Sequence, residues 1–79
     1  MNSLEKLKEI LKNTDDLYLR SPIEEIQPSM NLITDLGIDS LTRITIFYEI
    51  TDHFEVEVDE EIAASWNTIS DVTKFIEQL

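Results

Sequence analysis

The sequence contains no cysteine, one glycine and two prolines. Without cysteine the chain can form neither a disulfide framework nor a metal site with thiolate ligands. So few glycines and prolines favour a helical chain with few sharp turns. Basic residues are also scarce, because 6 Lys and Arg stand against 17 Asp and Glu, for a net charge of −11. Such a surface repels nucleic acid and anionic membranes, and it attracts partners that carry basic patches.

Long apolar runs are missing as well. No stretch approaches the roughly 20 apolar residues that a membrane-spanning helix needs, and residues 1–6 lack the apolar segment of a signal peptide. We therefore expect a monomeric cytoplasmic protein that does not insert into membranes. The 79 residues suit one small domain, 1–79, which buries only roughly 60% of its unfolded surface. A large internal active site is not expected in so small a core.

Helical periodicity begins near the N-terminus, where Asn2 can cap a helix with Glu5 three residues later. The apolar residues at helical spacing are Leu4, Leu7 and Leu11, followed by Leu17 or Tyr18, with Ile10 widening the stripe. Pro22 can then start at most one turn, because Pro28 follows closely. Residues 20–38 are therefore predicted to form a long ordered loop, and loops of this length are usually functional. The apolar residues that would pin it to the core are Ile23, Ile26, Met30, Leu32 and Leu36.

Three further helices are predicted after the loop. Asp39 can cap a long helix that runs to about Phe54, and residues 56–58 connect it to a short helix that Asp59 caps and that ends near Trp66. Thr68 can cap the last helix, with Asp71 three residues on. The apolar stripe of this last helix consists of Ile69, Val72, Ile76 and Leu79, with Phe75 beside it. The predicted fold is all-α: a small four-helix bundle of three main helices and one short helix, with a long loop between the first and second helices.

The segment Asp35–Leu41 is the most informative part of the chain. Gly37 breaks the backbone, Asp39 is placed to cap a helix, and Ser40 follows at the first helical position. Such a serine is held at the exposed end of a helix, where a large group can be attached without disturbing a core. Besides capping, Asp39 can present negative charge to an enzyme or metal ion that approaches Ser40.

The helix over residues 39–54 has two apolar faces. One face, which we expect to lie in the core, consists of Ile46, Phe47, Ile50 and Phe54. A second stripe starts directly after Ser40 and consists of Leu41, Ile44 and Tyr48, with Thr45 and Asp52 close beside it. The second stripe is a candidate docking surface for a partner that acts on Ser40. The alternative is that both stripes belong to the core, since the middle helix of a small bundle can be nearly surrounded.

The run Leu36-Gly37-Ile38-Asp39-Ser40-Leu41, preceded by Leu32 and followed by an amphipathic helix, resembles the acyl carrier proteins and related carrier domains. The long preceding loop, the acidic residues, the chain length and the helix over residues 68–79 fit the same pattern. The resemblance covers the whole chain. It implies a four-helix bundle with a long first loop.

The resemblance also implies a function. Ser40 would be the attachment point of 4′-phosphopantetheine, which a magnesium-dependent phosphopantetheinyl transferase transfers from coenzyme A. The arm ends in a thiol that carries acyl groups as thioesters to partner enzymes, such as acyl-activating ligases or synthases with basic and apolar docking patches. The carrier itself performs no catalysis and needs no metal site, and in fatty-acid carriers the apolar interior can shelter an acyl chain. Asp39, Leu41, Ile44 and Tyr48 fall at recognition positions of this family, which agrees with the second stripe.

The residues just after Ser40 depart from the housekeeping fatty-acid pattern. Thr42 and Thr45 stand where that pattern places acids, and Thr51 is neutral where an acid is common, although Asp52 follows it. Arg43 stands in the first helical turn, where the helix dipole disfavours a cation. Tyr48 is bulkier than the usual aliphatic residue. We therefore expect a carrier of fatty-acid, polyketide or related acyl groups that serves a dedicated synthase or ligase.

Other functions remain open from the sequence alone. A D-alanyl, aminoacyl or peptidyl-type carrier shares the serine motif, and Trp66 gives it slight support. An acidic helical adaptor without a prosthetic group is a second alternative. A hydrolase is not expected, because Ser40 lacks the Gly-x-Ser-x-Gly elbow and the single histidine, His53, lies far along the same predicted helix. A calcium loop starting at Asp35 fails as well, because Ile46 would occupy the position of its bidentate glutamate.

Overall fold

The computed structural model describes residues 2–14 and 17–79. Within them the chain forms four α-helices and one 3₁₀ turn, and its only β pairing is an isolated bridge between Asn31 and Thr68. The elements are α1 (Ser3–Lys12), η1 (Ile23–Glu25), α2 (Ser40–Phe54), α3 (Glu61–Ala64) and α4 (Ile69–Glu77). The predicted all-α fold with a long first loop is confirmed.

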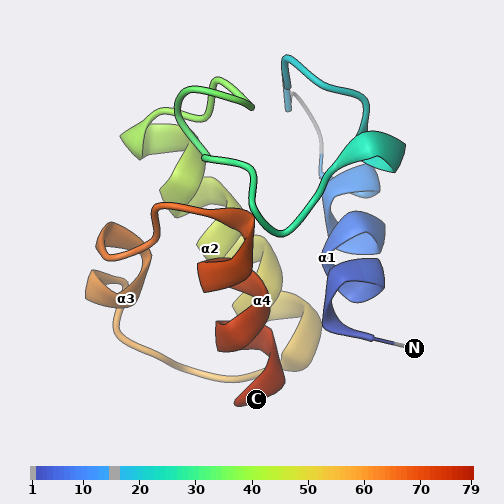
Figure 1. Cartoon of the computed structure of the whole chain (residues 1–79). Helices are drawn as coiled ribbons and strands as arrows, with labels where there is room; N and C mark the ends of the chain where they lie inside the picture. Colours follow the sequence, from blue (N-terminus) through green and yellow to red (C-terminus); the bar gives the residue numbers. More distant parts are fainter. Residues whose placement is uncertain (1, 15–16) are drawn as a thin grey trace.

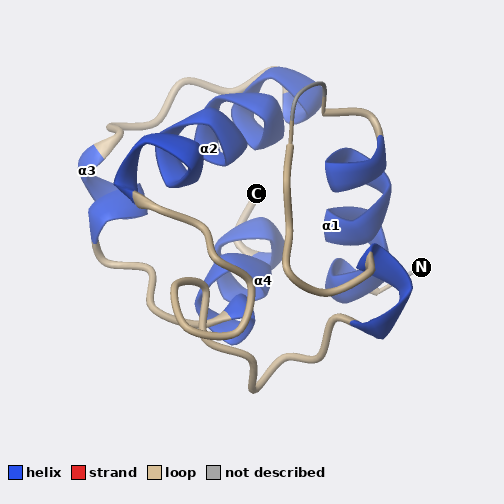
Figure 2. Ribbon diagram, turned by 90° about the horizontal axis from the view of Figure 1, so that it is seen from above, coloured by secondary structure: helices blue, strands red, loops and turns tan. Residues whose placement is uncertain are grey.

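The three longer helices enclose the core. Helix α1 packs against both α2 and α4, and the short α3 lies beside α2 at the edge of the bundle (Figure 1). Seen from above, the long loop crosses the space between α1 and α2 before it turns into the start of α2 (Figure 2). The loop therefore covers one end of the bundle, and it delivers the chain to the exposed N-terminus of α2.

Helix α1 begins as predicted but is shorter. The Asn2 Oδ1 accepts a hydrogen bond from the Glu5 amide at 2.8 Å, and the helix ends at Lys12. Continuation of the stripe to Leu17 or Tyr18 was wrong, since neither residue is helical and Tyr18 is 84% exposed; residues 15–16 of that stretch lie outside the described residues. A local contact explains the end, because the buried Thr14 hydroxyl donates to the Ile10 carbonyl at 2.8 Å and competes with further helix formation.

Residues 20–38 form the predicted ordered loop with one short turn, η1. Ile26, Leu32 and Leu36 are buried, whereas Ile23 and Met30 are half-buried against the core. Backbone hydrogen bonds tie the loop to the start of α4: the amides of Leu32, Ile69 and Ser70 donate to the carbonyls of Asn67, Met30 and Pro28 at 2.9, 3.0 and 2.9 Å. Three backbone hydrogen bonds thus hold the loop against the start of α4.

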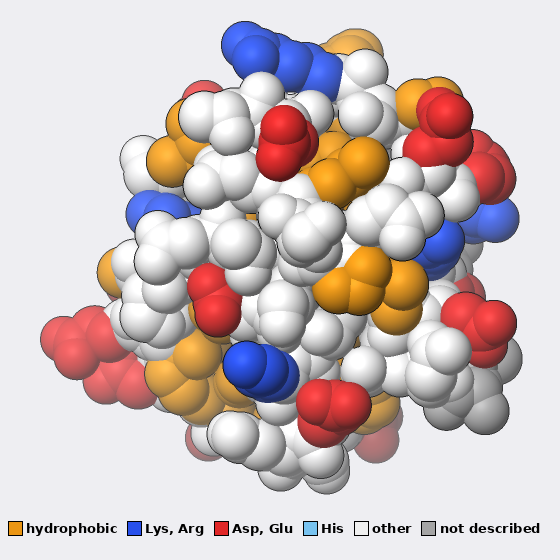
Figure 3. All heavy atoms as spheres, viewed as in Figure 1, with side chains coloured by type: hydrophobic (Ala, Val, Ile, Leu, Met, Phe, Trp, Pro, Cys, Tyr) orange, Lys and Arg blue, Asp and Glu red, His pale blue; other side chains and the backbone are white. Residues whose placement is uncertain are grey.

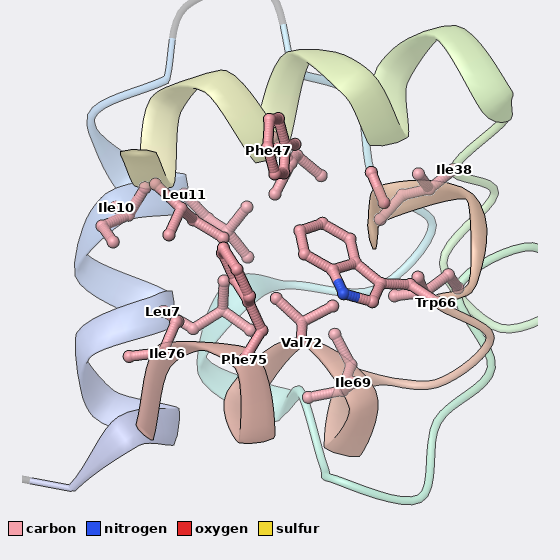
Figure 4. Close-up of a cluster of buried hydrophobic side chains, with 14 of the residues drawn as sticks. Leu7, Ile10, Leu11, Ile38, Phe47, Trp66, Ile69, Val72, Phe75 and Ile76 are labelled. Carbon is pink, nitrogen blue, oxygen red and sulfur yellow. The ribbon is translucent and has the colours of Figure 1, made fainter. Parts of the chain in front are cut away.

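The core is centred on three aromatic side chains. Phe47 of α2 lies 6.0 Å from Trp66 and 5.9 Å from Phe75, measured between ring centroids, and Trp66 lies 5.5 Å from Phe75. Figure 4 shows these rings meeting between α2 and α4, with aliphatic side chains of α1 and α4 packed around them. The predicted core face of α2 is confirmed for Ile46, Phe47 and Ile50, all buried, while Phe54 is half-buried.

The C-terminal third follows the predicted caps with small shifts. The N-cap of α3 is Glu60 rather than Asp59, but the Asp59 carboxylate accepts a hydrogen bond from the Glu61 amide at 3.0 Å. The predicted Thr68 and Asp71 pair forms a full capping box at the start of α4. Leu79 does not extend the stripe, because it lies beyond the end of α4 and is 40% exposed.

Candidate functional site

A polar turn positions the chain just before α2. The Asn31 Oδ1 accepts hydrogen bonds from the amides of Ile33 and Thr34 at 2.9 and 3.0 Å, and the Asp35 carboxylate accepts one from the Asn31 amide at 2.7 Å. The buried Ile38 closes the turn, because its amide donates to the Leu32 carbonyl at 2.8 Å. These contacts fix the path of the two residues that follow.

Gly37 is required by the backbone of this turn. Its φ is +71°, a left-handed conformation that residues with a Cβ rarely adopt. A Cβ at this position would also lie 3.1 Å from the Nε of Arg20. Arg20 braces the same turn, since its amide donates to the Leu36 carbonyl at 3.1 Å and its guanidinium to the Thr34 carbonyl at 3.2 Å.

Asp39 is the N-cap of α2, as predicted. Its carboxylate accepts a hydrogen bond from the Thr42 amide at 2.8 Å. This bond stabilises the ionised form and lowers the pKa of Asp39 below its ordinary value. The carboxylate is exposed, so a fixed negative charge stands directly beside Ser40.

Ser40 is the first residue of α2 and is exposed. Its hydroxyl makes no hydrogen bond to the residues that the structure describes, so no internal bond has to break before a group is attached there. The positive end of the α2 dipole also lies here, and it favours a phosphate group. An exposed hydroxyl at a helix N-terminus therefore fits the attachment of a phosphate-linked arm.

The second stripe of α2 is narrower than predicted. Leu41 and Tyr48 are 76% and 53% exposed, and Asp52 is exposed beside them. Ile44, which we expected on the same free surface, is half-buried and packs against the core. Helix α2 packs against both α1 and α3, so more than one of its faces is enclosed.

Tyr48 makes a contact that the sequence did not predict. Its hydroxyl donates a hydrogen bond to the Glu60 carboxylate, with 2.5 Å between the oxygens. This bond, together with the negative charge of Glu60, raises the pKa of Tyr48 above its ordinary value. Tyr48 thus links the exposed side of α2 to the segment that starts α3.

Arg43 points inward rather than toward solvent. The side chain is half-buried, and its guanidinium donates a hydrogen bond to the Trp66 carbonyl at 3.2 Å. This contact offsets the unfavourable position of a cation in the first turn of α2. The signal in the sequence was that mismatch with the dipole, but the sequence could not show where the side chain goes.

Neither a metal-binding cluster nor a membrane-spanning helix occurs in the part of the chain that the structure describes. Over residues 2–14 and 17–79, no three His, Asp or Glu side chains are grouped so that they could hold a metal ion. Among the same residues, no helix is long and apolar enough to cross a membrane. His53 is exposed near the end of α2, at the far end of that helix from Ser40.

Comparison with known proteins agrees with this geometry. The family described as "Phosphopantetheine attachment site" matches residues 5–76. Acyl carrier protein 3 of Ralstonia nicotianae is 39% identical over 59 residues, which cover 75% of this chain and 68% of that relative. The chain therefore belongs to the acyl carrier protein family, whose members carry acyl groups on a covalently attached 4′-phosphopantetheine and have no catalytic activity of their own.

Proposed function

We propose that Ser40 is the residue of this chain that carries the 4′-phosphopantetheine arm. The observation that carries the proposal is the exposed hydroxyl of Ser40 at the first position of α2, directly after the N-cap Asp39. When bound, the arm supplies a terminal thiol on which acyl groups are carried as thioesters. Asp39 holds the first turn of α2 in place and offers its negative charge to the transferase.

Intact mass measurement tests this assignment. The chain is incubated with coenzyme A, magnesium and a phosphopantetheinyl transferase, and we expect a mass gain of one phosphopantetheinyl group. Ser40→Ala should abolish the gain. Ser29→Ala, which changes another exposed serine, should leave it intact. No gain in the unaltered chain, or a gain that survives Ser40→Ala, would overturn the assignment and favour the acidic adaptor.

We also propose that partners dock on the exposed part of the second stripe, Leu41, Tyr48 and Asp52, with a smaller contribution from the half-buried Ile44. Members of the family act with a phosphopantetheinyl transferase and with acyl-handling enzymes. An exposed leucine next to the modified serine suits an apolar pocket, and the acidic surroundings suit a basic rim.

Truncation of Leu41 tests the docking surface. Leu41→Ala should lower kcat/KM of the transferase about five- to tenfold, as expected for a buried apolar anchor at an interface. Ile33→Ala is the matched control. Ile33 is also apolar and is 56% exposed, but it lies in the loop rather than on α2. Equal loss in both variants would contradict a docking surface on α2.

The pathway is a further proposal: this carrier serves a dedicated synthase or ligase of fatty-acid, polyketide or related acyl biosynthesis. Thr45 is exposed beside Leu41, where the housekeeping pattern has an acid. Turnover of the loaded carrier by housekeeping fatty-acid synthase components tests it, and activity equal to that with their own carrier would contradict it.

Trp66, the residue that gave slight support to an aminoacyl-type carrier, has another explanation. Trp66 is 2% exposed and packs in the aromatic core, so it is accounted for by packing. The acid that the cognate ligase activates onto the arm would distinguish the two cargo classes. The expected cytoplasmic location and monomeric state stay predictions, and light scattering of the purified chain would test the second.

A further inference from the structure

The guanidinium of Arg43 is only partly satisfied inside the bundle. One terminal nitrogen donates to the Trp66 carbonyl at 3.2 Å, but the Nε is buried and has no hydrogen-bond partner among the described residues. A buried donor without a partner destabilises the fold. The bond to the Trp66 carbonyl uses only a terminal nitrogen, so the buried Nε calls for a further explanation.

The same side chain lines a small, partly open apolar cavity between the helices. This cavity has a volume of about 10 Å³, at the lower limit of the roughly 10–15 Å³ that one water needs. Apart from Arg43, its lining is apolar and comes from α1, the long loop, α2, the connector between α3 and α4, and α4: Leu7, Leu11, Leu32, Ile38, Ile46, Trp66, Ile69 and Val72. Several of these side chains are seen converging in Figure 4. Arg43 is thus the one charged group at the boundary of an otherwise apolar space.

Arg43 also lies one helical turn below Ser40. Residues three apart on a helix are neighbours on its surface, with Cβ atoms about 5–6 Å apart. A group attached to Ser40 that entered the bundle beside α2 would first meet the Arg43 side chain. To pass, it would have to displace the guanidinium from the Trp66 carbonyl and leave a charged group against an apolar chain, which is unfavourable.

We infer that Arg43 closes the apolar interior beneath Ser40, so that the acyl group stays outside the bundle and the cargo is a short or polar acyl group. The inference rests on the proposed attachment at Ser40 and specifies the cargo class of that site. A long aliphatic chain kept in water would gain nothing from this carrier, whereas a short or polar group needs no shelter.

Thermal unfolding of acyl-loaded carriers tests the inference. Acetyl- and octanoyl-loaded forms are prepared from the unaltered chain and from Arg43→Ala. In the unaltered chain we expect the same unfolding temperature for both acyl groups, and no change in the amide resonances of Leu7, Ile46 and Val72. In Arg43→Ala the octanoyl form should unfold at a higher temperature than the acetyl form, and those resonances should shift. Arg43→Met keeps the bulk of the side chain and removes its charge, so it separates the contribution of the bulk from that of the charge.

Arg20→Ala is the matched control. Its guanidinium also donates to one backbone carbonyl at 3.2 Å, that of Thr34, but Arg20 does not line the cavity. It should show no dependence on acyl length. Octanoyl-dependent shifts of the core amides in the unaltered chain would overturn the inference, whatever the variants do.

The experiment also separates this inference from the proposed function. Failure of the transferase to load Ser40 is a failure of the attachment site alone. In that case the chain can be loaded through Ser40→Cys, since no other cysteine is present, with an iodoacetamide that bears a pantetheine-length octanoylated linker. The same comparison with and without Arg43→Ala then decides whether the interior is closed.

Discussion

Asp39 and Asp71 each stabilise the start of a helix through their ionised carboxylates. Asp39 accepts a hydrogen bond from the Thr42 amide, and Asp71 accepts bonds from the amides of Asn67 and Thr68 at 2.8 and 3.1 Å. These bonds lower the pKa of both residues in the folded chain. A lowered pKa means that the stabilisation is present above the ordinary pKa of about 3.9 and is lost as the pH falls through the lower, folded value.

Acid titration of stability tests this role at Asp71. We expect the free energy of unfolding of the unaltered chain to fall as the pH drops below about 4. Asp71→Asn should be less stable than the unaltered chain at pH 7, and its free energy of unfolding should fall less on acidification. Urea midpoints at pH 7, 5 and 3 measure both. Glu57→Gln is the control, because Glu57 is exposed in the connector after α2. Parallel curves for Asp71→Asn and the unaltered chain would contradict the role.

Gly37 offers a second test at the level of one residue. Gly37→Ala should destabilise the fold by about 1–2 kcal/mol, the cost of a left-handed backbone for a residue with a Cβ, which lowers the unfolding temperature by roughly 4–16 °C in a domain of this size. Adding Arg20→Ala removes the 3.1 Å contact but not the backbone strain. A stability gain in Gly37→Ala would show that φ is not held positive.

At the level of helices and loops, the starts of the three longer helices were predictable, whereas part of the side-chain packing was not. Asn2, Asp39 and Thr68 were correctly predicted as caps, because a cap depends on a side chain and an amide only two or three residues apart. The half-buried Ile44 and the inward Arg43 depend on segments distant in sequence. The end of α1 depends on the bond from the Thr14 hydroxyl to the Ile10 carbonyl, which the apolar pattern could not show. Thus the cap of α2 and the position of Ser40 at its first residue were predicted from the sequence, whereas the narrowed stripe and the inward course of Arg43 needed the structure.

The capping box of α4 allows a direct measurement of one such local interaction. Thr68→Ala removes the hydroxyl that accepts from the Asp71 amide at 3.3 Å and should cost about 1 kcal/mol. The loss should also loosen the loop, because the bonds from the Leu32 amide to the Asn67 carbonyl and from the Ile69 amide to the Met30 carbonyl lie on either side of Thr68. Thr68→Ser keeps the hydroxyl and should retain most of the stability in urea unfolding. Equal losses in both variants would point to the methyl group instead.

Across the whole molecule, like charges are crowded with few opposing ones. The net charge is −11, and Figure 3 shows acidic side chains spread over one face rather than gathered in one cluster (Figure 3). The two ion pairs that the described residues form, Lys6 with Glu9 and Lys12 with Glu24, span 3.8 and 4.0 Å and are substantially exposed. Exposed pairs of this kind contribute little, so net repulsion dominates the electrostatics of the folded chain.

Salt should therefore stabilise this protein rather than weaken it. Folding brings the acidic residues closer together than in the unfolded chain, and raising the ionic strength from about 0.01 to 0.1 M shortens the screening length from about 30 to 10 Å. We expect the unfolding temperature to rise with NaCl. MgCl₂ at equal ionic strength should add little more, since no metal-binding group of three side chains occurs in residues 2–14 and 17–79. An unfolding temperature that falls on addition of NaCl would mean that the two ion pairs outweigh the repulsion. A much larger rise in unfolding temperature with magnesium would reveal a specific cation site.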